Sequence, residues 1–270
     1  MNHDSSPDTS VINLQHVSLR RDSRTLWKDL DVRIRPGEFV AVLGPNGAGK
    51  TSLLKMLLGL LPATRGTVDV LGEVPRRGNP HIGYIPQQKG FDPDIPIRGR
   101  DLVRLGVTGF QYGLATPHPD TDRDIDDAIS AVGASAYANM PIGLLSGGEQ
   151  QRLRVAQALV GRPKLLLCDE PLLSLDVTSQ QTVTKLIDDY RQREHASVVF
   201  VTHEINPVLR YVDRILYLTA GKWAFDKPDV VLRSDVLSDL YGSSIEVVHV
   251  KDRIIVLGTE EAAAHHEEAA

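Results

Sequence analysis

The feature that most constrains this chain is a glycine-rich segment with the pattern G-x-x-x-x-G-K-[ST]. It reads Gly44, Pro45, Asn46, Gly47, Ala48, Gly49, Lys50, Thr51. Glycines let backbone N–H groups approach a polyphosphate, and a helix that follows adds its positive N-terminal end. Lys50 would supply charge to the β- and γ-phosphates, Thr51 a hydroxyl ligand for Mg²⁺, and Ser52 an α-phosphate contact. The segment predicts a nucleoside triphosphatase without separating a transporter subunit from a GTPase, helicase or kinase.

Three short apolar runs, at residues 39–43, 165–168 and 198–201, predict strands of a parallel sheet covered on both faces. Leucines and valines at helical spacing lie between them, so we predict an α/β core. The remaining predictions are strands at 11–19 and 30–34, a long connection at 75–99, an inserted helical region at about 100–160, a hairpin at 215–218 and 222–225, a small β extension at 247–257 and a disordered tail at 260–270.

Composition narrows the class of protein. The 270 residues carry a net charge of -5, so nucleic acid is not an expected partner. Cys168 stands alone, which excludes an intrachain disulfide and fits a reducing compartment. Residues 1–10 lack the basic start and apolar run of a signal peptide. No apolar stretch approaches the roughly 20 residues of a membrane span, so another chain would have to supply any channel.

Two acidic residues, Asp169 and Glu170, follow the apolar run at 165–168. In open α/β sheets, ligands bind outside the carboxyl ends of the strands. We therefore expect Asp169 to hold Mg²⁺, directly or through water, and Glu170 to act as general base toward the attacking water. The alternative is a solvated acid pair at a strand end, which the phosphate loop upstream makes the weaker interpretation.

Two further polar side chains follow predicted strands. His203 comes soon after the run at 198–201 and could reach a γ-phosphate, although a lone histidine is usually structural or solvated. Gln87 follows the strand-like segment 81–85, and its amide is a candidate ligand for Mg²⁺ or water. The chemistry alone does not choose Gln87 over Gln88, and an ordinary polar loop is the alternative.

A second phosphate-binding helix start is predicted at Ser146, because Ser146 and Glu149 have the S-x-x-E spacing of a capping box. Gly147 and Gly148 leave the first backbone donors of that helix bare. One nucleotide cannot obviously use both helix starts of one chain. Two copies arranged head-to-tail would instead sandwich each ATP between the loop of one copy and the Ser146 helix start of the other. A well-capped helix without a ligand is the alternative.

Taken together, these segments resemble the ABC ATPase family, with residues 145–152 similar to its signature sequence. Asp176, in the sequence Ser174-Leu175-Asp176, resembles the D-loop aspartate, Gln87 the Q-loop glutamine and His203 the switch histidine. The resemblance covers about residues 11–240. It implies ATP and Mg²⁺ as cofactors, with Lys50, Glu170 and His203 as catalytic residues and Thr51, Gln87 and Asp169 as metal ligands. Gly147, Gly148 and Glu149 would contact the nucleotide held by the second copy.

The family resemblance also implies a fold and partners. The fold is a P-loop, RecA-like core with an antiparallel β subdomain and a helical subdomain at about 88–160. Residues 1–240 would form the ATPase domain and residues 241–270 a small C-terminal extension. The implied partners are a second copy, integral-membrane permease subunits touched near Gln87 and, indirectly, an extracytoplasmic solute-binding protein. The implied location is peripheral, on the cytoplasmic face of the cell membrane.

One position departs from the family pattern. The family often places an aromatic residue where the adenine binds, but the corresponding residues 19–22 contain none. The guanidinium plane of Arg21 could stack in its place, whereas Trp27 lies too far along the chain. The adenine contact is therefore less defined than the phosphate contacts.

Residues 82–87, 92–96, 101–106 and 202–207 resemble the zinc/manganese-type metal-uptake branch of the family. We therefore expect an importer ATPase for Mn, Zn or Fe, with iron-siderophore or heme import as an alternative. The cargo would not bind this subunit, and His265 and His266 are expected to lie in a solvated tail. The rivals from other classes are a soluble ABC ATPase outside transport and a non-catalytic regulatory subunit. The first usually has two cassettes or a long coiled-coil insertion, and the intact Lys50, Asp169, Glu170 and His203 set argues against the second.

Overall fold

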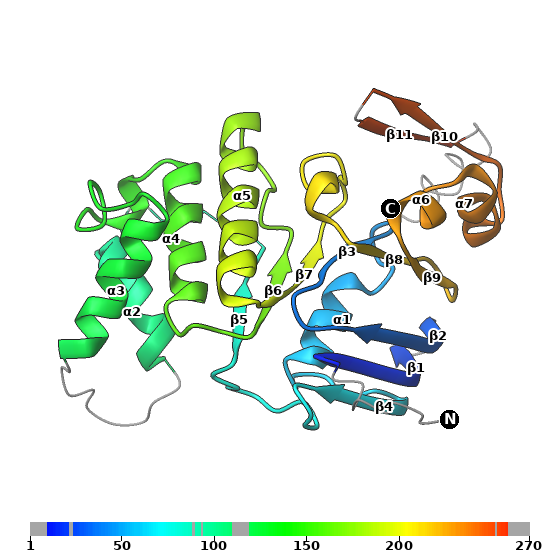
Figure 1. The fold of residues 1–270 in the computed structure, drawn as a ribbon, viewed down its shortest axis with the longest axis horizontal. Coiled ribbons are helices and arrows are strands. Elements are labelled where there is room, and N and C mark those ends of the chain that lie inside the picture. Colours follow the sequence, from blue (N-terminus) through cyan, green and yellow to red (C-terminus); the bar gives the residue numbers. More distant parts are fainter. Residues whose placement is uncertain are drawn as a thin grey trace, which may run out of the picture. The chain divides into compact units, whose positions relative to one another are not determined.

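The computed structural model describes residues 10–21, 24–87, 90–92, 94–109, 119–251 and 253–258. The chain forms two compact units (Figure 1). The first unit combines Met1–Pro75 with His203–Ala270, and the second consists of Arg76–Thr202. The predicted phosphate loop lies in the first unit and the predicted acidic pair in the second.

An antiparallel sheet of the first unit has the strand order β2-β1-β4. Its strands are β1 (Ile12–Arg21), β2 (Arg24–Ile34) and β4 (Arg65–Val70). The strand predicted at 30–34 was too short, because the consecutive buried residues Leu26 and Trp27 interrupt the alternation that marks a half-buried strand. No strand was predicted at β4, whose first three residues are all exposed.

A second group of strands in this unit leads into the phosphate loop. Strand β3 (Phe39–Leu43) is buried along its whole length and pairs in parallel with β8 (Arg214–Leu218), which pairs antiparallel with β9 (Trp223–Asp226). Asp213 fastens the start of β3, since its carboxylate accepts from the Phe39 N–H at 2.8 Å. The buried run and the hairpin predicted from the sequence are confirmed. Helix α1 (Lys50–Leu57) follows the loop.

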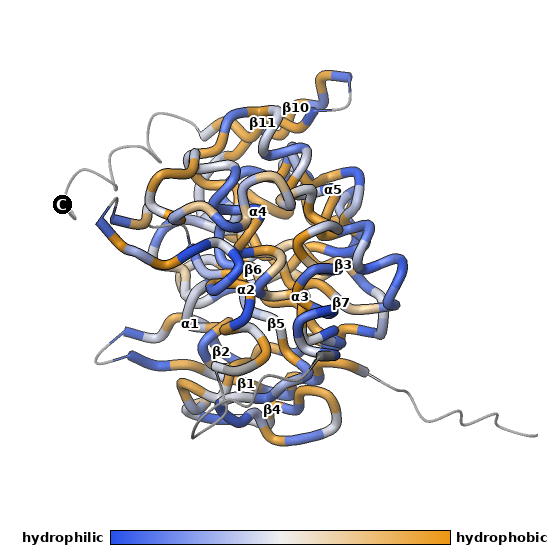
Figure 2. Tube along the Cα trace, turned by 90° about the vertical axis from the view of Figure 1, so that its left-hand side faces the viewer, coloured by the Kyte–Doolittle hydropathy of each residue, from blue (hydrophilic) through white to orange (hydrophobic). Residues whose placement is uncertain are grey.

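The C-terminal part of the first unit contains two short helices and a β-ribbon. The elements are α6 (Pro228–Val231), α7 (Ser234–Tyr241), β10 (Ile245–Val250) and β11 (Arg253–Gly258). Hydrophobic residues run along both strands of the ribbon (Figure 2). The predicted small β extension is confirmed, and the tail predicted at 260–270 lies outside the described residues.

The second unit combines a parallel sheet with a group of helices. Strands β5 (Ile82–Ile85), β6 (Leu165–Asp169) and β7 (Ser197–Val201) pair in that order, and every residue of β6 and β7 is buried. The helices are α2 (Gly99–Thr108), α3 (Pro119–Ala131), α4 (Gly147–Leu159) and α5 (Val177–Glu194). Helices α2, α3 and α4 pack on one another (Figure 1). The predicted α/β class with parallel, fully covered strands is confirmed.

Candidate functional site

The predicted phosphate loop connects β3 to α1, and a close backbone contact shapes its start. Gly44 has φ 136, and a Cβ there would lie 1.9 Å from the carbonyl oxygen of Leu218 on β8. Only glycine allows this approach. At the other end of the loop, Gly49 is the N-cap residue of α1. It has no side chain with which to accept a hydrogen bond from the first N–H groups of the helix.

Lys50 is the first residue of α1 and folds back over the loop. Its side chain is buried, at 6% exposure, and Nζ donates to the carbonyl oxygens of Gly44 at 2.7 Å and Pro45 at 3.1 Å. These two bonds hold the ammonium group beside the loop backbone, where an anion bound to the N–H groups would meet it. Thr51 is exposed and Ser52 half-buried in the next positions of the helix.

Two side chains of strand β2, Trp27 and Arg24, lie next to this loop. Trp27 is fully buried, and a Cβ on Gly49 would lie 2.6 Å from its indole Nε1. Trp27 therefore packs beneath the loop as a structural support and presents no open face to a base. The guanidinium of Arg24 lies beside the loop, with Nη1 3.9 Å from where a Cβ of Gly47 would be. Arg21, whose guanidinium plane could stack on adenine, is exposed at the end of β1.

In the second unit, Asp169 ends β6 with only 3% exposure. The hydroxyl of Tyr84, on the neighbouring strand β5, donates to its Oδ2 at 3.5 Å. Burial and then the charge of Asp169 raise the pKa of Tyr84 to about 12, so the phenol stays protonated as a donor. The sequence did not single out Tyr84. One signal in the sequence could have indicated Tyr84: it lies in the strand-like segment immediately before Ile85-Pro86-Gln87.

Glu170 follows in an unusual backbone conformation, with φ 47. A non-glycine residue in the left-handed region carries strain that neighbouring contacts must hold. One such contact is the Glu170 N–H, which donates to the carbonyl oxygen of Val201 at 3.0 Å. The side chain then reaches Gln87, whose Nε2 donates to Oε2 at 3.4 Å. The structure thus brings Gln87 and Glu170 together, while Gln88 lies outside the described residues.

The predicted capping box at the start of α4 is confirmed. The Glu149 N–H donates to Ser146 Oγ at 3.4 Å, and Glu149 Oε2 accepts from the Ser146 N–H at 2.9 Å and its hydroxyl at 2.8 Å. These donors lower the pKa of Glu149, the side-chain bond contributing most. Gln150 secures the preceding turn, because its Nε2 donates to the carbonyl oxygens of Ile142 and Leu145.

The starts of α4 and α5 lie close together. Asp176 caps α5, with its carboxylate accepting from the N–H of Ser179 at 3.0 Å and its hydroxyl at 2.6 Å. A Cβ on Gly148 would lie 2.8 Å from the same hydroxyl. Ser179 therefore lies between Asp176 and Gly148, which are 28 positions apart in the sequence. The hydrogen-bond donors to the Asp176 carboxylate, of which the Ser179 hydroxyl contributes most, lower the pKa of Asp176.

The remaining predicted residue, His203, is exposed at the start of the C-terminal part of the first unit. The predicted nucleotide-site residues thus fall into two groups. The phosphate loop and His203 belong to the first unit, and Gln87, Asp169, Glu170, Asp176 and the Ser146 helix start belong to the second.

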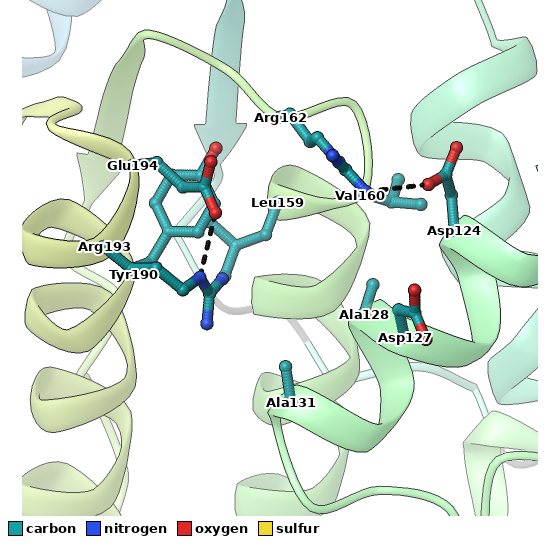
Figure 3. A pocket seen from close by; sticks show the side chains of 10 residues that line it. All are labelled: Asp124, Asp127, Ala128, Ala131, Leu159, Val160, Arg162, Tyr190, Arg193 and Glu194. Carbon is teal, nitrogen blue, oxygen red and sulfur yellow. Dashed lines mark hydrogen bonds and ion pairs between the residues drawn. The ribbon is translucent and has the colours of Figure 1, made fainter.

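Figure 3 shows a pocket of about 260 Å³ between α3 and the ends of α4 and α5. Four of its charged side chains pair with one another, Arg162 with Asp124 at 3.2 Å and Arg193 with Glu194 at 2.9 Å. None of the predicted site residues lines it. In the described part of the chain, no three His, Cys, Asp or Glu side chains gather as a metal cluster, and no helix has the length and apolar character of a membrane span.

The sequence of this chain is similar to those of known proteins. The family described as ABC transporter matches residues 27–173. The manganese transport system ATP-binding protein MntB of Halalkalibacterium halodurans is 30% identical over 247 residues, which cover 92% of this chain and 98% of MntB. The manganese protein is therefore similar to this chain over almost the whole length of both.

Two solved structures are similar as well. A putative metal-chelate type ABC transporter in an inward-facing conformation has 25% identity and a TM-score of 0.79, covering 94% of this chain and 99% of its own. The dimeric post-hydrolysis ATP-binding cassette MJ0796, bound to ADP and Pi, has 26% identity and a TM-score of 0.67, covering 80% and 98%. These likenesses confirm the predicted P-loop cassette fold.

Proposed function

Because this chain belongs to the ABC transporter family, whose ATP-binding subunits bind and hydrolyse ATP, we propose that it powers import of a metal ion through a separate permease. The observation that supports a metal as the cargo is the similarity to a manganese transport ATP-binding protein over 92% of this chain. The metal-chelate type neighbour favours a chelated metal as the second candidate cargo. In either case, the cargo crosses the permease and does not bind this subunit.

The nucleotide would be held first by its phosphates. The N–H groups of residues 44–49 and the uncapped start of α1 form a cradle for an anion, and Lys50 is already folded against that cradle. Ser52 and Thr51 extend it along the helix. This positioning, together with charge neutralisation, supplies most of what phosphoryl transfer requires from a protein.

The residues predicted to hold Mg²⁺ carry the kinds of oxygen donor that this ion prefers. Asp169 offers a buried carboxylate at a strand end, and Thr51 and Gln87 add a hydroxyl and an amide oxygen. Mg²⁺ prefers hard oxygen ligands and is commonly bound by one or two carboxylates plus substrate phosphates, so the lack of a larger acidic cluster among the described residues agrees with it. When bound, the ion neutralises charge on the phosphate oxygens.

Glu170 is the proposed general base toward the attacking water. It has a left-handed backbone conformation immediately after β6, and Gln87 Nε2 contacts its carboxylate at 3.4 Å. A glutamine that contacts the base can also release it, so movement of Gln87 would change how Glu170 is oriented. His203 is the proposed contact to the γ-phosphate.

The second copy completes the proposed site. Ser146, Gly147 and Gly148 at the start of α4 would face the γ-phosphate held by the loop of the partner copy, with Asp176 beside them. The support is twofold: one chain holds two helix starts suited to phosphate, and the similar cassette MJ0796 is dimeric with ADP and Pi bound. A head-to-tail pair would enclose two nucleotides in equivalent sites.

We place the permease contact beside Gln87. A groove of about 630 Å³ is lined by β5, the end of α2 and the end of α4, and in it the aromatic Tyr84 and the apolar Leu105 are 36% and 48% exposed. A permease segment in this groove would touch β5, which leads into Gln87, and through Gln87 it would affect the base. The subunit would then work on the cytoplasmic face of the membrane, with a solute-binding protein delivering cargo from the other side.

The test of catalysis is Glu170→Gln, with Glu194→Gln, an exposed glutamate at the end of α5, as the matched control. We expect the first variant to bind ATP with unchanged affinity and to release phosphate at least about 100-fold more slowly, since the general base is lost. The control should keep its turnover. Unchanged phosphate release by Glu170→Gln would remove Glu170 as the base.

The test of the cargo uses the protein together with the permease that co-purifies with it. In proteoliposomes, we expect ATP hydrolysis to rise when a cargo-loaded solute-binding protein is present, and Mn²⁺, Zn²⁺ and an iron chelate are compared. Stimulation by a substrate that contains no metal would overturn the metal assignment. Association with ribosomes or DNA instead of a permease would favour a role outside transport.

A further inference from the structure

The C-terminal ribbon, residues 245–258, has no place in the proposed mechanism so far. Its two strands form a regular antiparallel ladder from Ile245↔Gly258 to Val250↔Arg253. A two-stranded ribbon alone is marginally stable in water. What holds this one is a set of contacts to other parts of the first unit, and those contacts point to what it does.

Strand β10 is fastened to α7 by two serines. Ser238 Oγ accepts from the Ile245 N–H at 2.9 Å, and Ser234 Oγ accepts from the Val247 N–H at 2.9 Å. Helix α7 is fastened in turn to β8, where the hydroxyls of Tyr241 and Tyr217 lie 2.9 Å apart. Since β8 pairs with β3, the strand that leads into the phosphate loop, the ribbon is connected to the nucleotide-binding end of the unit.

Strand β11 is fastened to a different segment by a single side chain. The Asn206 amide exchanges two hydrogen bonds with the backbone of Ile254: Oδ1 accepts from its N–H at 2.8 Å, and Nδ2 donates to its carbonyl oxygen at 3.0 Å. The amide thus replaces a neighbouring strand at one residue of the ribbon. The N–H and C=O groups of Ile254, which is only 8% exposed, therefore both have hydrogen-bond partners in the Asn206 amide.

Asn206 lies three residues after His203, in the same short segment. The segment is compact at its far end, since Ile205 and Val208 are buried and the N–H groups of Val208 and Leu209 donate to the carbonyl oxygen of Ile205. His203 itself is exposed. Asn206 is therefore a tie between the ribbon and the segment from which the histidine projects.

We propose that Asn206 is a positioning residue through which the C-terminal ribbon holds the His203 segment in the orientation needed for hydrolysis. The inference rests on the proposed role of His203. The ribbon, α7 and β8 form one connected frame, so the phosphate-loop strand and the His203 segment are held by the same set of hydrogen bonds. A misplaced γ-phosphate contact slows the chemical step without weakening the many loop contacts that bind ATP.

The first test is Asn206→Ala in the full chain, with the exposed Asn139→Ala as the matched control. We expect kcat to fall about tenfold while the Kd for ATP changes less than about twofold, because the tie acts on the transition state alone. Hydrogen exchange should rise in the peptide around 203–209 and at Ile254. Unchanged kcat, or equal losses of ATP affinity and kcat, would overturn the proposal.

The second test removes the ribbon. A chain ending at Ser243 should show the same loss of kcat as Asn206→Ala, whereas a chain ending at Gly258, which keeps the ribbon, should match the full chain. Adding Asn206→Ala to the shorter chain should change kcat less than about twofold, since both changes break the same tie. Independent, multiplying losses would show that Asn206 acts elsewhere and would overturn the proposal.

His203→Ala separates this inference from the function on which it rests. If His203→Ala abolishes hydrolysis while Asn206→Ala and the shorter chain keep full turnover, the proposed role of His203 stands and the tie is overturned. If His203→Ala itself keeps full turnover, the role of the histidine fails first, and the tie fails with it.

Discussion

Tyr84 shows how one hydroxyl can set the geometry of a proposed metal ligand. It donates to Asp169 Oδ2 at 3.5 Å from the neighbouring strand, and the raised pKa of about 12 keeps it protonated throughout the neutral range. Asp169 is buried, so each donor to its carboxylate limits the orientations that the side chain can take. Tyr84 is therefore expected to position Asp169 without touching the nucleotide.

Tyr84→Phe tests this role. Loss of one weak hydrogen bond to the carboxylate should raise the Mg²⁺ concentration for half-maximal ATP hydrolysis about threefold, with little change in turnover at saturating Mg²⁺. Tyr211→Phe, whose hydroxyl contacts Arg210, is the control. An unchanged Mg²⁺ requirement in Tyr84→Phe would show that Asp169 does not depend on this donor.

The same residue gives a pH dependence whose sign follows from its pKa. The pKa of Tyr84 is raised in the fold from its ordinary value of 10.0, so the unfolded chain loses this proton first as the pH rises. The contribution of Tyr84 is fully present below pH 10 and is lost between pH 10 and about 12. The Tm of Tyr84→Phe should therefore fall less steeply with pH over that window than the Tm of the unmodified protein. Equal slopes would contradict the burial and charge assigned to the phenol.

Residues such as Tyr84 and Asn206 mark the limit of what the sequence predicts. Lys50, Asp169 and Glu170 belong to contiguous patterns whose chemistry is readable from spacing. The contact of Tyr84 with Asp169 joins positions 85 apart, and that of Asn206 with Ile254 joins positions 48 apart. Such pairs depend on strand order and register, which local patterns do not specify.

At the scale of single elements, α4 is the helix whose start was best specified by its sequence. Ser146 and Glu149 form the predicted reciprocal cap, and the Ser146 donors lower the pKa of Glu149. Because the carboxylate form is favoured in the fold, its contribution to stability is present above the ordinary pKa of 4.5 and is lost as the pH falls through the lowered value.

Glu149→Gln tests the cap. The residue is half-buried at the start of the helix and its carboxylate remains in contact with solvent, so screening limits its effect to about 0.5 kcal/mol of unfolding free energy near pH 7. We expect a slightly lower Tm at pH 7, and a difference from the unmodified protein that shrinks as the pH falls below 4.5. A difference that grows on acidification would mean that the carboxylate is not stabilised by the cap.

Predictability of the other elements followed their burial. Strands β3, β6 and β7 are buried throughout and were found as apolar runs, whereas β4 is exposed over its first three residues and was missed. Helix α7 was also missed, because it has eight residues and no side-chain cap hydrogen bond to mark its start. Its place is set by contacts with β8 and β10 that form only in the folded chain.

At the scale of the whole molecule, the central claim concerns two copies of the chain. The uncapped start of α1 and the Gly147-Gly148 start of α4 belong to different compact units, and each is suited to an anion. A two-fold head-to-tail dimer would use both helix starts twice, around two nucleotides. Closing of such a dimer with ATP, followed by opening after hydrolysis, is the motion that a permease could use.

The measurement that tests this claim most directly is the structure of the Glu170→Gln protein trapped with ATP and Mg²⁺. We predict a dimer in which each γ-phosphate lies between Lys50 of one copy and the Ser146-Gly147-Gly148 helix start of the other. A trapped complex in which that helix start lies far from every phosphate, or in which a monomer holds ATP fully enclosed, would contradict the account.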